Sequence, residues 1–365
     1  MINKRPKIAV IGLKGLPAFG GAAAVGENII EQLTENYYFT VYSISSHTNF
    51  HTGKYKQICH QIVFRSIPFK KLNSLYYYLL SAIHVLFKNY DLIHLHHRDA
   101  AFIIPLLRMR YKVILTIHGY GTEDLSDKWS KFRLYYLLQE RFFIKFANRI
   151  TTMSKHEQKK IRNHYAGHVD YIPNGVSVSN FIENYRKDYI LFVAGRIVSF
   201  KRCDILLQSL INMEYKGKLI IIGDIDQTKD YKEKILELSS KLPHVEFKGL
   251  IKDKNELNKY YQKAKLFVFP SFREAMSMVL LEAASKGVPI IASRIEGNTQ
   301  IFSSKEVLFF EVDDVQNLSE KIIWAMNNYD KMLEKSLRAV SKLNINYTWS
   351  NIAQKYKSVY QTYLQ

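Results

Sequence analysis

The chain has few cysteines and lacks a hydrophobic run long enough to cross a membrane. Its 365 residues include two cysteines, Cys59 and Cys203, far apart and without metal-ligand spacing. A reducing compartment is therefore expected. The longest apolar stretch, Leu72 to Phe87, is too short and too interrupted to span a bilayer, and no signal peptide is visible. These features predict a cytoplasmic globular protein, neither secreted nor membrane-spanning.

Acidic residues are the other scarce group. The chain has 33 aspartates and glutamates against 52 lysines and arginines, which gives a formal net charge of +19. Residues 1–175 hold 24 basic and 11 acidic side chains, and the remainder holds 28 and 22. This excess favours an anionic partner: nucleic acid, an acidic membrane surface or a diphosphate-linked substrate. A generic basic surface is the alternative.

The most informative segment runs from Pro270 to Ser293 and carries two glutamates, Glu274 and Glu282, separated by seven residues. A buried strand leads in, a helix is predicted from about Ser277 to Lys286, and Gly287 ends it before another strand. In open parallel sheets, ligands bind beyond the carboxyl ends of the strands, where Glu274 and the helix start fall. We therefore expect both carboxylates to face one cleft.

This spacing suits a nucleotide-sugar. Glu274 can accept hydrogen bonds from sugar hydroxyls, and Glu282 can accept two from a ribose diol. Backbone N–H groups at the helix start can bind phosphate, and they belong to Ser277, Met278 and Val279. Two ordinary solvated glutamates are the alternative. The segment closely resembles the E-x7-E motif of glycosyltransferase family 4, retaining enzymes of the GT-B architecture, through PS..E.....LLEA...G.P...S.

The amino terminus shows a buried strand from Lys7 to Leu13, a glycine-rich loop and an amphipathic helix from about Ala22. The loop glycines allow close approach of a ligand to the backbone: Gly12, Gly15, Gly20 and Gly21. Their spacing does not fit the dinucleotide fingerprint. The loop resembles the first loop of the same family, which implies that Gly20 and Gly21 lie against the donor diphosphate and the acceptor.

Strand-like segments then alternate with helical ones, which predicts a parallel sheet with helices on both faces. The helix near Leu72 places a stripe on one face, and we interpret it as core: Leu72, Leu75, Tyr76, Leu79, Ile83 and Phe87. Lysines and tyrosines flank it, so an interfacial or lipid-acceptor role stays open. A terminal amphipathic helix carries Trp349, Ile352, Ala353, Tyr356, Val359, Tyr360 and Leu364 at helical spacing.

Four histidines near strand ends have two different interpretations. On a strand, His94 and His96 share one face while His97 points away, and no further ligand is spaced to complete a metal site. His118 ends the strand KVILTIHG at the ligand-binding edge, where a structural histidine is the alternative to a functional one. The TIHG segment resembles the family's strand end, whose histidine lies beside the transferred sugar.

A polar stretch from Pro173 to Lys187 is the predicted linker, and IPNGV within it resembles the family's usual junction. The next strand delivers Gly195 and Arg196, with Lys201 five residues later at a helix start. Two cations there can together neutralise a diphosphate leaving group, in place of a divalent metal. Surface cations are the alternative. G-R-x4-K resembles the family's donor-phosphate motif.

Asp224 and Asp226 form a D-x-D pair, which holds a metal in another glycosyltransferase architecture. The pair is short and recurs by chance, so we expect neither metal nor other cofactor. Three positions depart from the family pattern. Ala275 stands where glycine is usual, which puts the sugar's identity in doubt, and Asn298 and Gln300 replace a glycine and a glutamate.

The resemblance covers nearly the whole chain and implies two doubly wound α/β domains facing across a cleft. The expected domains are 1–175 for the acceptor, 176–345 for the nucleotide-sugar, and a terminal helix, 346–365, that packs back on the first. The expected catalytic residues are His118, Arg196, Lys201 and Glu274, and the donor-binding residues are Gly20, Gly21, Ser277, Met278, Val279 and Glu282.

The predicted reaction transfers a sugar from a nucleotide-diphosphate sugar to a glycan or lipid-linked acceptor with retention, in surface polysaccharide biosynthesis at the inner face of the cell membrane. No dedicated nucleophile is visible, because Glu274 is assigned to the sugar, so same-face substitution is the simpler hypothesis. Three alternatives stay open. They are a nucleotide-sugar epimerase, a non-catalytic nucleotide-sugar-binding module, and a nucleic-acid-binding protein. Nucleic-acid binding would explain the positive charge but would not explain the paired glutamates.

Overall fold

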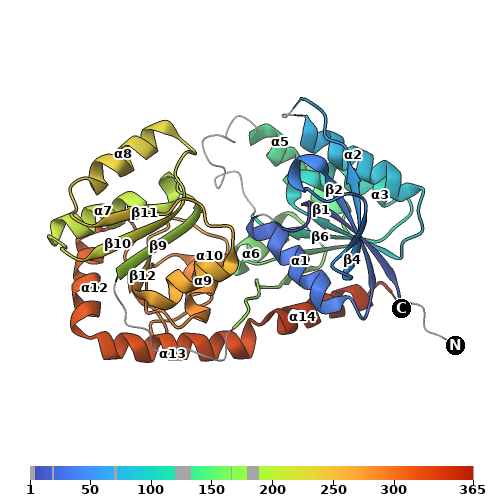
Figure 1. Cartoon of the computed structure of the whole chain (residues 1–365). Coiled ribbons are helices and arrows are strands. Elements are labelled where there is room, and N and C mark those ends of the chain that lie inside the picture. Colours follow the sequence, from blue (N-terminus) through green and yellow to red (C-terminus); the bar gives the residue numbers. More distant parts are fainter. Residues whose placement is uncertain are drawn as a thin grey trace. The chain divides into compact units, whose positions relative to one another are not determined.

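The computed structural model describes residues 5–18, 20–69, 72–119, 133–165, 167–178 and 189–364. Its contacts divide the chain into two units (Figure 1). Unit 1 comprises Met1–Gly175 and Trp349–Gln365, and unit 2 comprises Val176–Thr348. Each unit contains a parallel sheet with connecting helices, so the prediction of two doubly wound α/β domains is confirmed. Part of the predicted linker, residues 179–187, lies outside the described residues.

The sheet of unit 1 has the strand order β3-β4-β2-β1-β5-β6-β7-β8. Its strands are parallel except β3, which is antiparallel to β4 and was not predicted. The strands are β1 (Lys7–Lys14), β2 (Tyr38–Ile44), β3 (Gly53–Tyr55), β4 (Cys59–Phe64), β5 (Leu92–His96), β6 (Val113–Ile117), β7 (Arg149–Thr152) and β8 (Val169–Tyr171). Because β1, β5 and β6 are parallel neighbours, the loops that follow them emerge at one edge of the sheet.

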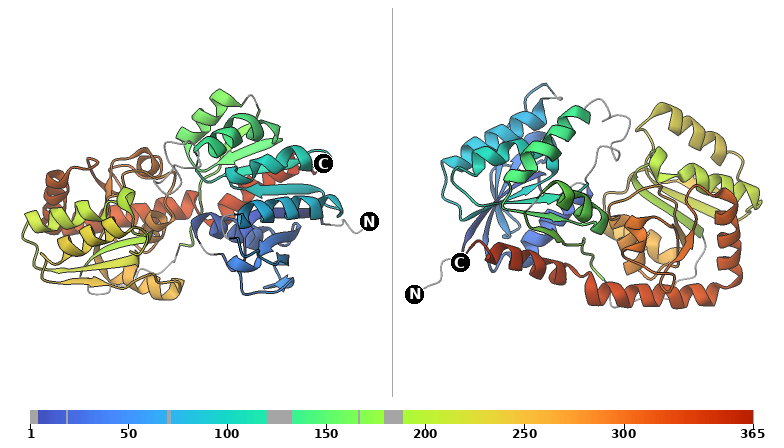
Figure 2. Two further views of the ribbon diagram at one scale, coloured as in Figure 1. Left: turned by 90° about the horizontal axis from the view of Figure 1, so that it is seen from above. Right: turned by 180° about the vertical axis from the view of Figure 1, so that it is seen from behind.

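Helices cover both faces of this sheet (Figure 2). Successive side chains of β5 point to opposite faces, so Ile93 and Leu95 join the core beneath α2, whereas His94 faces α14. The helical elements are α1 (Gly21–Leu33), η1 (Ser45–His47), α2 (Asn73–Leu86), η2 (Arg98–Ile103), α3 (Ile104–Leu107), α5 (Arg133–Leu138), η4 (Gln139–Phe143), η5 (Ile144–Phe146), α6 (Lys155–His164) and α14 (Trp349–Gln361).

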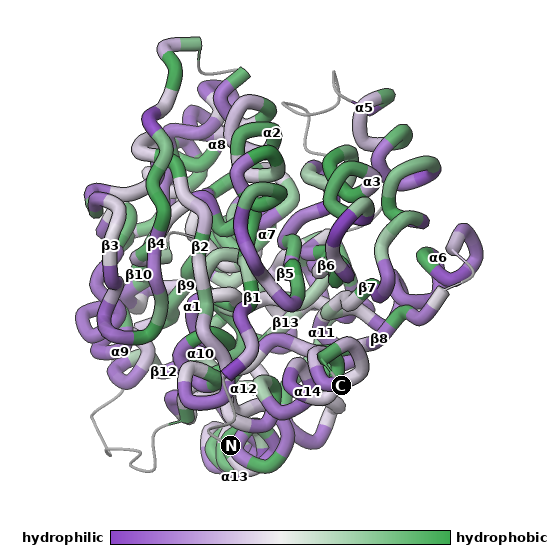
Figure 3. The backbone as a smooth tube through the Cα atoms, turned by 90° about the vertical axis from the view of Figure 1, so that its right-hand side faces the viewer, coloured by the Kyte–Doolittle hydropathy of each residue, from purple (hydrophilic) through white to green (hydrophobic). Residues whose placement is uncertain are grey.

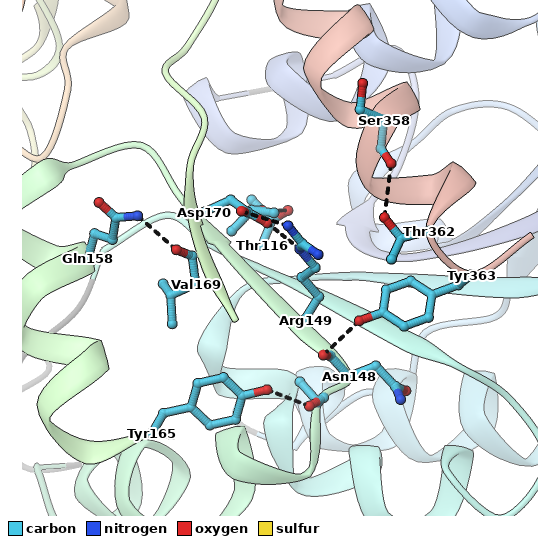
Figure 4. Close-up of polar contacts among 12 residues, drawn as sticks. Thr116, Asn148, Arg149, Gln158, Tyr165, Val169, Asp170, Ser358, Thr362 and Tyr363 are labelled. Atoms are coloured by element: carbon cyan, nitrogen blue, oxygen red, sulfur yellow. Dashed lines mark hydrogen bonds and ion pairs between the residues drawn. The ribbon is translucent and has the colours of Figure 1, made fainter. Parts of the chain in front are cut away.

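The terminal helix α14 belongs to unit 1 and packs against α1. Its predicted apolar face is the buried one from Trp349 to Tyr360, which confirms the amphipathic helix. Tyr360 contacts His94, with 2.7 Å between Oη and Nδ1. Beyond the helix, the Tyr363 hydroxyl donates to the Asn148 carbonyl at 2.9 Å (Figure 4). These contacts attach the carboxyl-terminal segment to the sheet of unit 1.

The core prediction for the stripe on α2 is wrong. The structure exposes five of its members, between 41% for Leu79 and 81% for Phe87, and leaves Tyr76 partly buried. The buried face of α2 instead carries Asn73, Tyr77, Tyr78, Ser81, Ala82 and Val85. Tyr77 on that face forms internal hydrogen bonds, since its Oη accepts from the Gly12 N–H and donates to the Tyr42 carbonyl. The helix therefore buries a face that is less hydrophobic than the predicted stripe.

Unit 2 contains a parallel sheet of order β11-β10-β9-β12-β13-β14. Its strands are β9 (Tyr189–Arg196), β10 (Lys218–Asp224), β11 (Val245–Phe247), β12 (Ala264–Phe269), β13 (Ile290–Ser293) and β14 (Leu308–Phe310). Its helical elements are η6 (Ser199–Lys201), α7 (Cys203–Asn212), α8 (Lys229–Ser239), α9 (Lys254–Lys263), α10 (Met278–Ser285), α11 (Glu296–Thr299), α12 (Val315–Asn327) and α13 (Tyr329–Asn346). Of the helices in the described part of the chain, none is long and apolar enough to cross a membrane.

Candidate active site

The candidate site lies in unit 2, at the edge where β9 and β12 end. The two strands are parallel neighbours, so the segments that follow them leave the sheet on the same side. β9 is buried from Tyr189 to Ala194 and ends with exposed Arg196. η6 then brings Lys201 to the edge, and the loop after β12 brings Glu274 there. Sheet topology therefore joins residues that lie 73 positions apart in the sequence.

Lys201 and Glu274 form an ion pair, and their side chains are 16% and 13% exposed. Two aromatic rings flank the ammonium group: Nζ lies 5.5 Å from the ring centroid of Phe200 and 5.8 Å from that of Phe269. Burying two charges is costly unless they are paired, so the contact fixes both side chains. The ammonium has three N–H donors, and Glu274 engages one of them. The remaining donors can bind an anionic ligand.

The loop that carries Glu274 is supported from behind by α11. The Gln300 side-chain amide donates to the Ala275 carbonyl at 2.6 Å. Gly297 lies directly against this loop, because a Cβ added there would be 2.1 Å from the Glu274 carbonyl oxygen. Asn298 is fully buried and donates to the Ser293 carbonyl at 2.9 Å. Asn298 and Gln300, two of the three residues that depart from the family pattern, thus hold α11 and the Glu274 loop in place.

Gly297→Ala is expected to lower kcat/KM by about tenfold or more, because the new methyl group must displace the Glu274 loop and small misplacements of reacting groups are costly. Steady-state kinetics would measure the loss. Thr299→Ala, an exposed position on the same short helix, is the matched control and should retain activity. Equal kinetics for both variants would contradict the role of Gly297.

α10 carries the second glutamate and begins and ends as its sequence predicts, within one residue at each end. The Ser277 hydroxyl caps its start by accepting from the Leu280 N–H at 3.4 Å. Gly287, with φ of +69°, follows its end. Met278 and Val279 form its first turn, where backbone N–H groups are free to bind an anion.

Glu282 lies on the partly buried side of α10. Burial raises the pKa of its carboxyl, while the positive charges of Lys254 and Lys286 oppose that shift. Hydrogen-bond donors stabilise a carboxylate in a partly buried position, and a ligand with two neighbouring hydroxyl groups could supply them to Glu282. Glu282 and Glu274 thus have different surroundings, since an ion pair holds Glu274.

Arg196 and the D-x-D pair lie at the ends of adjacent strands. Arg196 of β9 pairs in register with Asp224 of β10 and is exposed. Asp224 accepts from the Asp226 N–H at 2.9 Å and from the Gln227 side chain, and Asp226 pairs with Lys232 at 2.6 Å. Local contacts thus occupy both carboxylates. Among the described residues, no group of three or more histidines, cysteines, aspartates and glutamates is arranged to hold a metal ion.

Unit 1 has its own cluster of histidines, at the ends of β5 and β6, which includes the predicted residue His118. His118 Nε2 lies 3.0 Å from His96 Nδ1, and the two rings stack with centroids 5.3 Å apart. Burial lowers the pKa of His118 well below its usual value, and the neighbouring histidines add to this. The ring is therefore neutral near pH 7. His118 Nδ1 is buried and has no hydrogen-bond partner among the described residues.

The contact between His96 and His118 was not predicted, because the sequence around His96 suggested at most a metal ligand. The signal that could have found it is the register of two parallel strands, in which His96 pairs with Thr116, two residues before His118. His94 on the same face is held on both ring nitrogens, by Tyr360 and by Thr116, at 2.7 Å each. These contacts make His94 structural.

The glycine-rich loop after β1 divides into two parts. Gly12 and Gly15 approach the chain itself, since an added Cβ would lie 2.2 Å from the His96 carbonyl oxygen and 2.4 Å from that of His47. Gly20, with φ of +101°, has open space beside it and directly precedes α1, which begins at Gly21. Gly20 therefore leaves room for the predicted contact with a ligand, whereas Gly12 and Gly15 pack against the chain itself.

Family models match both halves of the chain. The model for glycosyl transferases group 1 matches residues 179–342, and the model for Glycosyltransferase Family 4 matches residues 19–180. The chain belongs to glycosyltransferase family 4. The family assignment agrees with the resemblance noted from the E-x7-E segment and the G-R-x4-K segment.

The chain is also similar to curated proteins in sequence and to solved structures in fold. The glycosyltransferase is 30% identical to an uncharacterized 41.2 kDa protein in the cps region of Klebsiella pneumoniae, over 78% of this chain and 80% of that one. It is 25% identical to the O-antigen biosynthesis glycosyltransferase WclY of Escherichia coli, over 75% and 79%. Anabaena HepE, solved in complex with UDP and glucose, has the same fold, with a TM-score of 0.78, 17% identity and coverage of 98% and 100%.

Proposed function

We propose that this glycosyltransferase transfers a sugar from a nucleotide-diphosphate sugar to a glycan or lipid-linked acceptor, with retention of anomeric configuration. The observation that carries the proposal is the Lys201–Glu274 pair at the edge where β9 and β12 end. The names of two similar proteins support it: one acts in O-antigen biosynthesis, and the other binds UDP and glucose. We accordingly propose a role in surface polysaccharide biosynthesis, at the cytoplasmic face of the membrane.

Unit 2 would bind the donor. Lys201 and Arg196 would neutralise the diphosphate, joined by the N–H groups at the start of α10 from Ser277. Glu282 would accept hydrogen bonds from the ribose, and Glu274 from the sugar. We propose that the two cations supply the positive charge that a metal provides in other transferases, so that no metal cofactor is needed.

For unit 1 we propose acceptor binding near Gly20 and Gly21, with His118 contacting the transferred sugar. A neutral His118 can use its unpartnered Nδ1 as donor or acceptor, depending on which tautomer the contact with His96 selects. In the reaction, the bond from the anomeric carbon to the diphosphate oxygen breaks, and the bond to the acceptor oxygen forms on the same face. The leaving phosphate oxygen takes the proton of the acceptor hydroxyl.

Binding of nucleotide-sugars tests this function directly. A panel of UDP-, GDP- and dTDP-sugars is expected to contain one that raises the melting temperature, because a ligand that binds only the folded state stabilises it. Incubation of that donor with an acceptor extract should then yield a product of retained configuration by NMR. Consumption of the donor without acceptor, giving an isomeric nucleotide-sugar, would identify an epimerase instead. If no member of the panel bound, the proposal would be wrong.

A further inference from the structure

Unit 1 exposes two rows of hydrophobic side chains on neighbouring helical segments. One row follows α2 and the other follows α5 to η5, with members every three or four residues along each segment. We call the two rows the apolar face, and its members are Leu72, Leu75, Leu79, Ile83 and Phe87, with Leu134, Leu138, Phe142 and Phe146. Each member is between 41% and 81% exposed. Figure 3 shows hydrophobic stretches on both helices.

The two rows lie close together because both segments pack on η2. The Tyr78 hydroxyl of α2 donates to the Asp99 carboxylate at 3.2 Å, and the Tyr135 hydroxyl of α5 donates to the Asp99 carbonyl. η2 also contacts η4, which continues α5. α2, η2 and η5 contribute to the same core cluster of unit 1, so the two rows lie on elements that cover one side of the sheet.

Lysines lie beside both rows, and the sequence around the first row contains no acidic residue. No aspartate or glutamate occurs between Glu35 and Asp91, a stretch that includes all of α2. Lys145 lies over the rings of Phe142 and Phe146, at 5.8 and 5.6 Å from their centroids. Lys145 has no carboxylate partner in the described part of the chain, and neither does Lys88 beyond the end of α2.

A basic cavity adjoins the end of the α2 row. Exposed Phe87 is followed by Lys88, which lines a cavity of about 680 Å³ together with Arg5, Lys7 and Lys54. None of the described residues that line this cavity is acidic. Hydrophobic side chains and unpaired cations are thus arranged side by side, as they are at the boundary between lipid headgroups and acyl chains.

We propose that the apolar face docks unit 1 on a bilayer that contains anionic lipids. The two hydrophobic rows would enter the acyl boundary, and the cations would contact lipid phosphates. Contiguous exposed apolar surface of this kind marks an interaction site in a soluble protein. This proposal rests on the proposed function, because that function includes an acceptor bound to the membrane. It identifies the surface that would bring unit 1 to that acceptor.

Flotation with lipid vesicles tests the proposal in the full-length protein without donor or acceptor. We expect binding to vesicles of phosphatidylcholine and phosphatidylglycerol, and at least about tenfold weaker binding to phosphatidylcholine alone or in high salt. Leu79→Glu with Ile83→Glu should weaken binding to the anionic vesicles by about tenfold or more. Leu337→Glu, at a residue of α13 that is 57% exposed, is the matched control and should bind like the unaltered chain.

Three outcomes would overturn the proposal. They are absence of vesicle binding by the unaltered chain, equal binding by the double variant, and equal binding to neutral and anionic vesicles. Light scattering adds a fourth outcome. If the unaltered chain were a dimer and the double variant a monomer, the apolar face would be an interface between two copies of the chain. Circular dichroism checks that the variants fold. Nucleotide-sugar binding to unit 2 is measured separately, so failure of docking and failure of the proposed function are distinguishable.

Discussion

Replacing Lys201 with alanine is expected to lower kcat by roughly 10²–10³-fold, the usual effect of removing one preorganised group that stabilises developing charge. Two losses combine in this variant. The diphosphate leaving group loses a cation, and Glu274 loses the partner that orients it in a partly buried position. Steady-state kinetics with the identified donor would measure kcat and KM. Most of the effect should fall on kcat, because the charge on the leaving group grows in the transition state.

Lys218→Ala is the matched control for this prediction. Lys218 pairs with Glu246 in the same sheet, but both side chains are 40% exposed and lie at the start of β10, away from the edge that carries Lys201. An exposed pair of this kind contributes little to stability, so activity should stay within about twofold. The double variant Lys201→Ala with Glu274→Gln should cost less than the sum of the single losses, because the residues act as one unit. Strict additivity would contradict the coupling of Lys201 and Glu274.

The strand and helix pattern predicted most of the fold, because period-two and helical hydropathy are local properties of the sequence. The same pattern placed Arg196 at the end of one strand and Glu274 in the loop after another. It did not predict that Lys201 touches Glu274, since that contact requires β9 and β12 to be neighbours in the sheet. Strand order depends on long-range packing and is not written in any single segment.

The error on α2 has a different physical cause. The prediction took the most hydrophobic stripe as the core, whereas the structure buries Tyr77, Tyr78 and Ser81 and exposes Leu79 and Ile83. Tyrosine side chains bury a large ring and can satisfy their hydroxyl groups inside the protein, as Tyr77 does. A hydropathy ranking therefore selects the wrong buried face for a helix whose most hydrophobic stripe is exposed. The mismatch itself was the signal for the apolar face.

Lowering the pH from 7.5 to 5.5 is expected to destabilise the protein markedly, because His94, His96 and His118 are buried and neutral. Burial lowers the pKa of His94 to about 3 and lowers that of His96 and His118 well below the usual value. Below about pH 6.5 the unfolded chain takes up protons that the folded chain does not. The free energy of unfolding therefore decreases as the pH is lowered below this value. Above about pH 6.5 these histidines are neutral in both the folded and the unfolded chain, so they no longer contribute to the pH dependence of stability.

Each such histidine contributes a slope of at most about 1.4 kcal/mol per pH unit between its unfolded and folded pKa. Chemical denaturation at a series of pH values would measure the slope. His94→Gln should lower stability at pH 7.5, because the ring loses its contacts with Tyr360 and Thr116, yet flatten the dependence on pH. Exposed His51→Gln is the control and should keep the slope of the unaltered chain. A slope unchanged by His94→Gln would show that this buried ring takes up protons in the folded state, and the hydrogen bonds from Tyr360 and Thr116 would then have to rearrange around a charged imidazole.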